Sequence, residues 1–143
     1  MKNKVVIFII IMTFLILTCF IIFKFLINVI VYLNFGVSIL PMNRRLYDYS
    51  ESGRDGDVYT VGKYRGKRLE KMKKLDWVSS LESDIYEDKL YEFLRNNNIP
   101  IEFVPVVDND TLYFLKKFDD KHDYLLIIYN VKESMFYIYQ YHI

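Results

Sequence analysis

Residues 5–23 read VVIFIIIMTFLILTCFIIF and hold no charged residue, no Gly and no Pro. As an α-helix, this stretch is roughly 28 Å long, close to the thickness of the hydrocarbon core of a bilayer. Only a hydrogen-bonded helix can carry such a segment through lipid, because lipid offers no partners to backbone groups. The stretch exceeds the apolar region of a signal peptide, and no small-residue cleavage site follows it directly. The sequence therefore predicts an uncleaved transmembrane helix, Val5–Phe23, which sets the organisation of the chain.

A second apolar stretch, Phe25–Leu40, follows after Lys24. In one topology only Val5–Phe23 spans, and the second stretch continues as a juxtamembrane helix on lipid or on the domain. In the other, both stretches span as a hairpin, which returns Arg44 and Arg45 to the cytoplasmic side. We favour the single span, because the sequence around Lys24 has no turn-forming residue.

The N-terminus is basic, with Lys2 and Lys4 directly before the apolar run. By the positive-inside rule, this favours a cytoplasmic N-terminus. With one span, the rest of the chain then lies on the far side. The expected localisation is the inner membrane, single-pass, with a soluble domain in the periplasm.

Composition excludes several kinds of site. The chain has 143 residues with 19 basic and 18 acidic side chains, so its net charge indicates no nucleic-acid partner. Cys19 is the only cysteine, which rules out an intrachain disulfide and a cysteine metal site. His122 and His142 do not show metal-ligand spacing, and no nucleotide or nucleophile motif is present. We therefore predict no catalytic, cofactor-binding or metal residue, no small-molecule substrate, and a protein that is not an enzyme.

The remaining chain divides into a connector and one small domain. We predict a membrane-associated part over residues 1–42, a polar connector over 43–62 and a soluble domain over 63–143. Ser, Gly and Asp residues between Tyr47 and Gly62 indicate turns, although Asp57–Tyr64 alternates weakly and suits a short strand.

Two helices are predicted in the first half of the domain. Leu69, Met72 and Leu75 recur at helical spacing within a basic run, which predicts a helix over Gly66–Trp77. Its cations fit anionic lipid headgroups, murein or an acidic partner, or alternatively a solvated helix face. The second helix is predicted over Glu82–Arg95, with Ser79 or Ser83 as its N-terminal cap.

The last third of the sequence changes to a period of two, which is typical of strands. Short polar loops join successive runs, so the runs predict an antiparallel meander of four strands. The predicted fold class is therefore α+β: an N-terminal transmembrane helix, then a small domain with helices packed on a four-stranded antiparallel sheet. The four predicted strands are Ile101–Val107, Thr111–Phe118, Tyr124–Val131 and Met135–Ile143. The third is apolar throughout, as expected of a central strand covered on both faces.

Tyrosine is the abundant functional side chain, with thirteen in the chain. On the last predicted strand, Tyr137, Tyr139 and Tyr141 share one face by the period of two. If that strand lies at the sheet edge, the three rings form an exposed aromatic patch suited to protein binding. The alternative is that they form the half-buried back of the sheet. The predicted protein-binding residues are these tyrosines together with Lys71 and Lys74.

The layout resembles membrane-anchored immunity proteins of bacteriocin producers, of the pesticin and colicin M types. The matching features are the basic start Met1–Lys4, the apolar Val5–Phe23, and the helix-then-strands order over Glu82–Ile143. The paired cysteines of the colicin M type are absent, so the pesticin type is the nearer one. The resemblance implies a periplasmic protein that binds and neutralises a murein-directed bacteriocin, with the toxin as its protein partner. The alternative is a non-catalytic accessory subunit of an inner-membrane or envelope complex.

Overall fold

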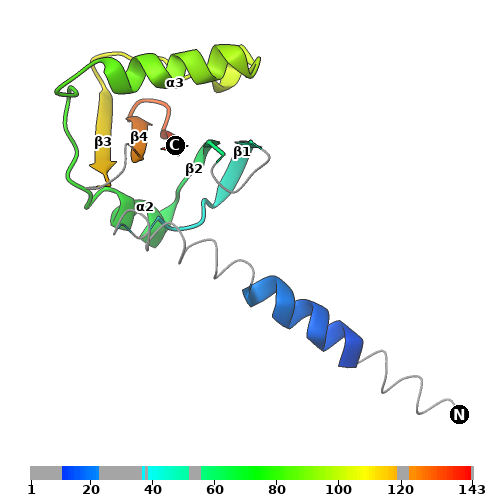
Figure 1. Cartoon of the computed structure of the whole chain (residues 1–143). Helices are drawn as coiled ribbons and strands as arrows, with labels where there is room; N and C mark the ends of the chain where they lie inside the picture. Colours follow the sequence, from blue (N-terminus) through cyan, green and yellow to red (C-terminus); the bar gives the residue numbers. More distant parts are fainter. Residues whose placement is uncertain (1–10, 23–36, 38, 52–55, 119–122, 143) are drawn as a thin grey trace, which may run out of the picture. The chain divides into compact units, whose positions relative to one another are not determined.

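The computed structural model of the chain describes residues 11–22, 37, 39–51, 56–118 and 123–142 (Figure 1). The chain forms two compact units, Met1–Ile39 and Leu40–Ile143. In the first unit residues 11–22 are helical, and the predicted span Val5–Phe23 extends beyond the described residues at both ends. Among the described residues no helix is both long enough and apolar enough to cross a bilayer. The predicted fold class included a transmembrane helix, and this part of the prediction is wrong for the residues that the structure describes. Most of the apolar stretch Phe25–Leu40 also lies outside the described residues.

The second unit is a small α+β domain built on an antiparallel sheet. Within the described residues this sheet has five strands in the order β1-β2-β5-β4-β3, and every neighbouring pair is antiparallel. The predicted sheet of four strands is therefore wrong. The strands are β1 Arg44–Ser50, β2 Val58–Lys63, β3 Thr111–Lys117, β4 Tyr124–Asn130 and β5 Met135–Tyr141.

Two differences from the predicted strands have clear physical causes. Ile101–Val107 forms no ladder: the segment begins as the 3-10 helix η1, Ile101–Phe103, and continues without a strand assignment. Pro105 lies inside it, and a proline has no N–H to donate to a neighbouring strand. In contrast, the residues 43–62 predicted to be a connector supply β1 and most of β2. The two strands pair through contacts such as Tyr49↔Tyr59 and form a hairpin at the edge of the sheet. The polar composition of residues 43–62 did not indicate this hairpin.

The position of β5 is the other correction. The last strand pairs with β2 on one side and β4 on the other, so it lies inside the sheet rather than at an edge. β3, β4 and β5 form the last three strands of the predicted four-stranded meander, and β2 extends them through pairs such as Tyr59↔Tyr139. β4 is buried along its whole length between β5 and β3, which confirms the predicted central strand.

The helix α3, Ile85–Asn96, covers one face of the sheet (Figure 1). Leu90, Phe93 and Leu94 of this helix form one core cluster with alternate residues of the strands. This helix begins three residues later than predicted. Ser83, rather than Ser79, lies at its start, where its hydroxyl accepts a hydrogen bond from the Ile85 N–H at 3.4 Å.

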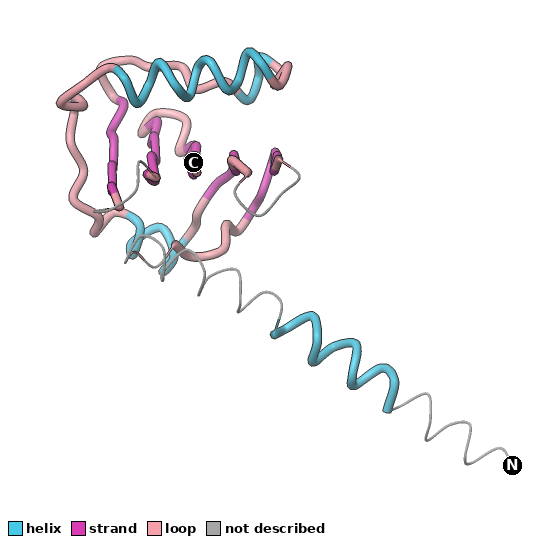
Figure 2. Tube along the Cα trace, in the orientation of Figure 1, coloured by secondary structure: helices cyan, strands magenta, loops and turns pink. Residues whose placement is uncertain are grey.

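The opposite face is covered at one end by α2, Gly66–Met72, and the turn that follows it (Figure 2). Met72 is buried, and Trp77 packs its ring against Phe114, Tyr129 and Phe136 with centroids 5.7–6.3 Å apart. The Trp77 indole N–H also donates to the Met72 carbonyl at 3.0 Å, which fixes the chain after the helix. The predicted helix therefore ends at Met72 and not at Trp77.

Candidate functional site

The three predicted binding tyrosines do not form an exposed patch. Tyr137 and Tyr139 are only 3% and 1% exposed, and both belong to the core cluster under α3. Tyr141 is half-buried, because Lys89 of α3 lies over its ring at 4.3 Å. The faces of β5 were correctly separated by the period of two, but β5 is not an edge strand. Both of its faces are covered, and Phe136 and Ile138 are as buried as the tyrosines.

The hydroxyl of Tyr139 instead completes a buried polar cluster. It donates a 2.6 Å hydrogen bond to one carboxylate oxygen of Asp57, and the backbone N–H of His142 donates to the other at 2.9 Å. Asp57 directly precedes β2, and His142 directly follows β5. The carboxyl group therefore joins the start of one strand to the end of its neighbour.

Burial dominates the electrostatics of this cluster. Desolvation raises the pKa of Asp57 above its ordinary value of 3.8, and the hydrogen bonds from Tyr139 and His142 act against that shift. The pKa of Tyr139 is also raised, first by burial and then by its bond to the Asp57 carboxyl. Burial likewise raises the pKa of Tyr124, whose hydroxyl is buried without a hydrogen-bond partner among the described residues. Both shifts favour the neutral form of the phenol.

A second contact at the same end of the sheet involves the terminal histidine. The Nδ1 atom of His142 lies 3.4 Å from a carboxylate oxygen of Asp123, which directly precedes β4. Asp57 and Asp123 therefore both hold residue 142, one through its backbone and one through its ring. The polar atoms of this cluster face one another, so we interpret the cluster as a clamp on the end of β5 and not as a reactive site.

The two predicted lysines are placed differently from the tyrosines. Lys71 lies in α2 and Lys74 in the turn after it, and both side chains are exposed. They belong to a larger basic surface on α2 and its turn. The structure does not bring these lysines together with the tyrosines of β5, because the tyrosines face α3 and α2 covers the opposite face of the sheet.

Exposed apolar side chains gather on the segment that returns from α3 to β3. Ile101, Val106 and Val107 are 83%, 64% and 44% exposed, and Val131 in the β4–β5 turn is 42% exposed. Bonds from Asn130 to the Val106 carbonyl and from the Val131 N–H to the Asp110 carbonyl hold this turn against the segment. We call these four residues the return-segment surface. Exposed acids lie beside it in the sequence: Glu102, Asp108, Asp110 and Glu133.

One ring contact and two hydrogen bonds hold residues 101–107 against the rest of the domain. Phe103 stacks on Tyr47 with centroids 4.7 Å apart, and its carbonyl accepts a 2.6 Å hydrogen bond from the Tyr59 hydroxyl. The Tyr91 hydroxyl donates to the Pro105 carbonyl at 3.2 Å. Sequence reasoning missed this surface because it treated the segment as a strand. Pro105 was the signal that could have identified it.

Within the described part of the chain, no group of three or more His, Cys, Asp or Glu side chains could hold a metal ion. No protein-family model, curated protein or solved structure matches the chain. The exposed side chains described above make two surfaces the candidate functional sites: the return-segment surface and the basic surface of α2.

Proposed function

We propose that this chain is a protein-binding module that neutralises a murein-directed bacteriocin by direct contact. The observation that carries the proposal is the return-segment surface, where four exposed apolar side chains lie on a backbone held by the core. Exposed apolar side chains that are grouped on one part of a small domain often mark a protein or membrane contact. Rigid attachment favours a protein partner, because less conformational entropy is lost when the contact forms.

Charge defines the partner further. The acids that flank the return-segment surface are Glu102, Asp108, Asp110 and Glu133, against which Lys132 is the neighbouring cation. Exposed apolar side chains with acids next to them in the sequence complement a partner surface that carries both apolar and basic side chains. We therefore expect the toxin to present such a surface.

Location belongs to the same proposal. A murein-directed toxin acts outside the cytoplasm, so the domain must work on the periplasmic side of the inner membrane. The basic N-terminus and the apolar sequence between residues 5 and 40 support an association with that membrane. Retention there raises the local concentration of the binding module without any additional contact.

Survival of sensitive cells tests the proposal. Cells that express the full chain should survive murein-directed bacteriocins that kill cells carrying an empty vector. Val107→Lys should reduce protection against the toxin that is neutralised, because it replaces one of the exposed apolar side chains of this surface with a cation. If Val107 is a binding hot spot, the change should weaken the complex by ~2 kcal/mol, or about 30-fold.

The matched control is Val78→Lys. Val78 is 46% exposed against 44% for Val107, and it lies outside the return-segment surface in an isolated bridge with Tyr113. It should retain protection. Equal loss of protection in both variants would contradict the assigned surface. No protection by the unmodified chain, combined with stable co-purification with envelope proteins, would favour the accessory-subunit alternative.

A further inference from the structure

Basic side chains concentrate on one short part of the domain. Between the end of β2 and the turn after α2, the chain carries seven cations and one acid, Glu70. The cations are Lys63, Arg65, Lys67, Arg68, Lys71, Lys73 and Lys74. This excess is local, because the whole chain has a net charge of only +1.

The fold separates these cations from the apolar side of the same helix. Met72 is the buried residue of α2, and Trp77, which follows the helix, packs on the sheet. Lys67 and Lys71 are exposed and four residues apart, and Lys74 follows after three more, so the three share one face of the helical path. We call Lys67, Lys71 and Lys74 the lysine face.

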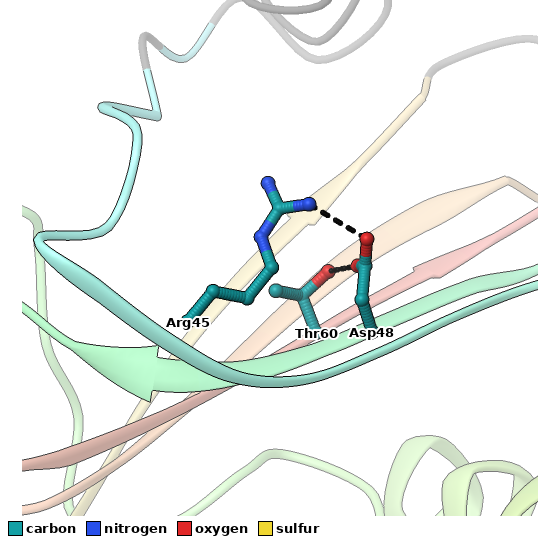
Figure 3. A network of polar contacts seen from close by, with 3 residues as sticks. All are labelled: Arg45, Asp48 and Thr60. Atoms are coloured by element: carbon teal, nitrogen blue, oxygen red, sulfur yellow. Dashed lines mark hydrogen bonds and ion pairs between the residues drawn. The ribbon is translucent and has the colours of Figure 1, made fainter.

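The lysine face is not neutralised by the domain itself. Glu70, the acid on α2, pairs with Lys73 at 3.7 Å. Among the described residues, no side-chain hydrogen bond or ion pair involves the three ammonium groups of this face. Nearby on β1, Arg45 is occupied by Asp48 at 2.6 Å, and Asp48 also accepts from Thr60 at 2.7 Å (Figure 3). The lysine face therefore remains available to an external anion.

The first turn of α2 and the two residues before it hold residues 40–43, where the domain begins. The Tyr64 hydroxyl donates to the Leu40 carbonyl at 2.7 Å, and Arg68 donates to the Pro41 carbonyl at 3.0 Å. The backbone N–H of Arg65 donates to the Asn43 side chain at 2.7 Å. The sequence that leads to this point, Phe25–Leu40, is apolar and has no charged residue. The helix that carries the lysine face is thus bonded, through Arg68, to the residue that directly follows this apolar sequence.

We propose that the lysine face of α2 binds anionic phospholipid headgroups at a membrane surface. Basic residues that adjoin an apolar segment attract anionic lipid, because each cation near the surface lowers the free energy of association. Soluble acidic proteins would match the charge alone, whereas a lipid surface matches both the charge and the adjoining apolar sequence. This contact is independent of the proposed toxin complex, which uses the return-segment surface.

Trp77 provides a local probe, because it is the only tryptophan in the chain and its indole N–H is bonded to the end of α2. The full chain is mixed with vesicles of phosphatidylcholine, with or without phosphatidylglycerol, that carry a headgroup-linked fluorescence quencher. We expect stronger quenching of Trp77 on the vesicles that contain phosphatidylglycerol, and the difference should decrease with added salt. This readout reports contact at α2 even if other parts of the chain also hold lipid.

Matched double variants separate this site from general charge effects. Changing Lys71→Gln together with Lys74→Gln should weaken the preference for anionic vesicles roughly 25-fold, or about fivefold for each lysine. The control pair, Lys116→Gln together with Lys132→Gln, removes the same charge from two exposed lysines elsewhere. It should change the preference for anionic vesicles little. Equal effects of the two pairs, or equal Trp77 quenching on both kinds of vesicle, would overturn the proposal. Full displacement by polyglutamate at the same charge concentration would also overturn it and would assign the surface to an acidic protein.

Discussion

At the scale of single residues, Tyr139 combines a core ring with a buried hydrogen bond. Its ring lies 5.0 Å from that of Phe93, and its hydroxyl donates to Asp57. Tyr139→Ala should lower the free energy of unfolding by about 3–5 kcal/mol, since it truncates a core aromatic. Tyr139→Phe removes only the hydroxyl and should cost about 1–3 kcal/mol, because the buried Asp57 loses a donor. Denaturant unfolding followed by Trp77 fluorescence measures both. A loss below 1 kcal/mol for Tyr139→Ala would contradict the buried placement.

The buried carboxyl of Asp57 makes the free energy of unfolding depend on pH, and the direction follows from its raised pKa. Burial raises its pKa in the folded protein above the ordinary value of 3.8, so the folded state holds the proton more tightly than the unfolded state does. The contribution of Asp57 to stability is therefore fully present below pH 3.8 and is lost as the pH rises through the folded-state pKa. Relative to Asp57→Asn, the unmodified chain should lose unfolding free energy across that interval. Denaturant titrations of both proteins at a series of pH values measure this difference, and a difference that does not vary with pH would refute the assignment.

At the scale of elements, the β1–β2 hairpin depends on a glycine. The register of this pair shifts between Arg45 and Tyr47, and a Cβ at Gly62 would collide with the Met42 side chain and the Arg44 carbonyl. Gly62→Ala should therefore lower the unfolding free energy by about 1–3 kcal/mol, the usual cost of overpacking. Thermal or denaturant unfolding measures it. The control Thr60→Ala, in the same strand, removes the 2.7 Å bond to Asp48 and should cost about 1 kcal/mol or less. A smaller loss for Gly62→Ala than for Thr60→Ala would contradict the close approach.

Elements with a strong local signal were predictable from the sequence, and elements that depend on distant partners were not. The apolar run of β4 and the amphipathic face of α3 appear in the sequence because burial on two faces, or on one stripe, leaves a direct pattern. β1 left no such pattern. It is an edge strand with Arg45 and Asp48 on its exposed side, and such charges also occur in loops.

At the scale of the whole molecule, the sequence predicted an α+β domain but not the strand order. Pairing of β2 with β5 joins residues about eighty positions apart, for example Tyr59 and Tyr139, and no local pattern encodes that contact. The binding prediction for Tyr137, Tyr139 and Tyr141 assumed that β5 is an edge strand. That placement was wrong, and the burial of Tyr137 and Tyr139 removes the exposed patch on which the prediction depended. The lysines Lys71 and Lys74 remained candidates because exposure of a basic helix face requires only its own amphipathic pattern.

The central place of β5 has a consequence for synthesis. Of the five strands in the described residues, β5 is synthesised last, and it separates β2 from β4 in the finished sheet. Until it emerges, the nascent chain presents two unpaired strand edges, and the seven residues of β4 have no neighbour on one side. Unpaired edges and uncovered apolar strands are the features that promote aggregation of incomplete chains. The sheet can therefore be completed only after β5 has been synthesised, and a stop codon before Met135 would leave β2 and β4 without the strand that joins them.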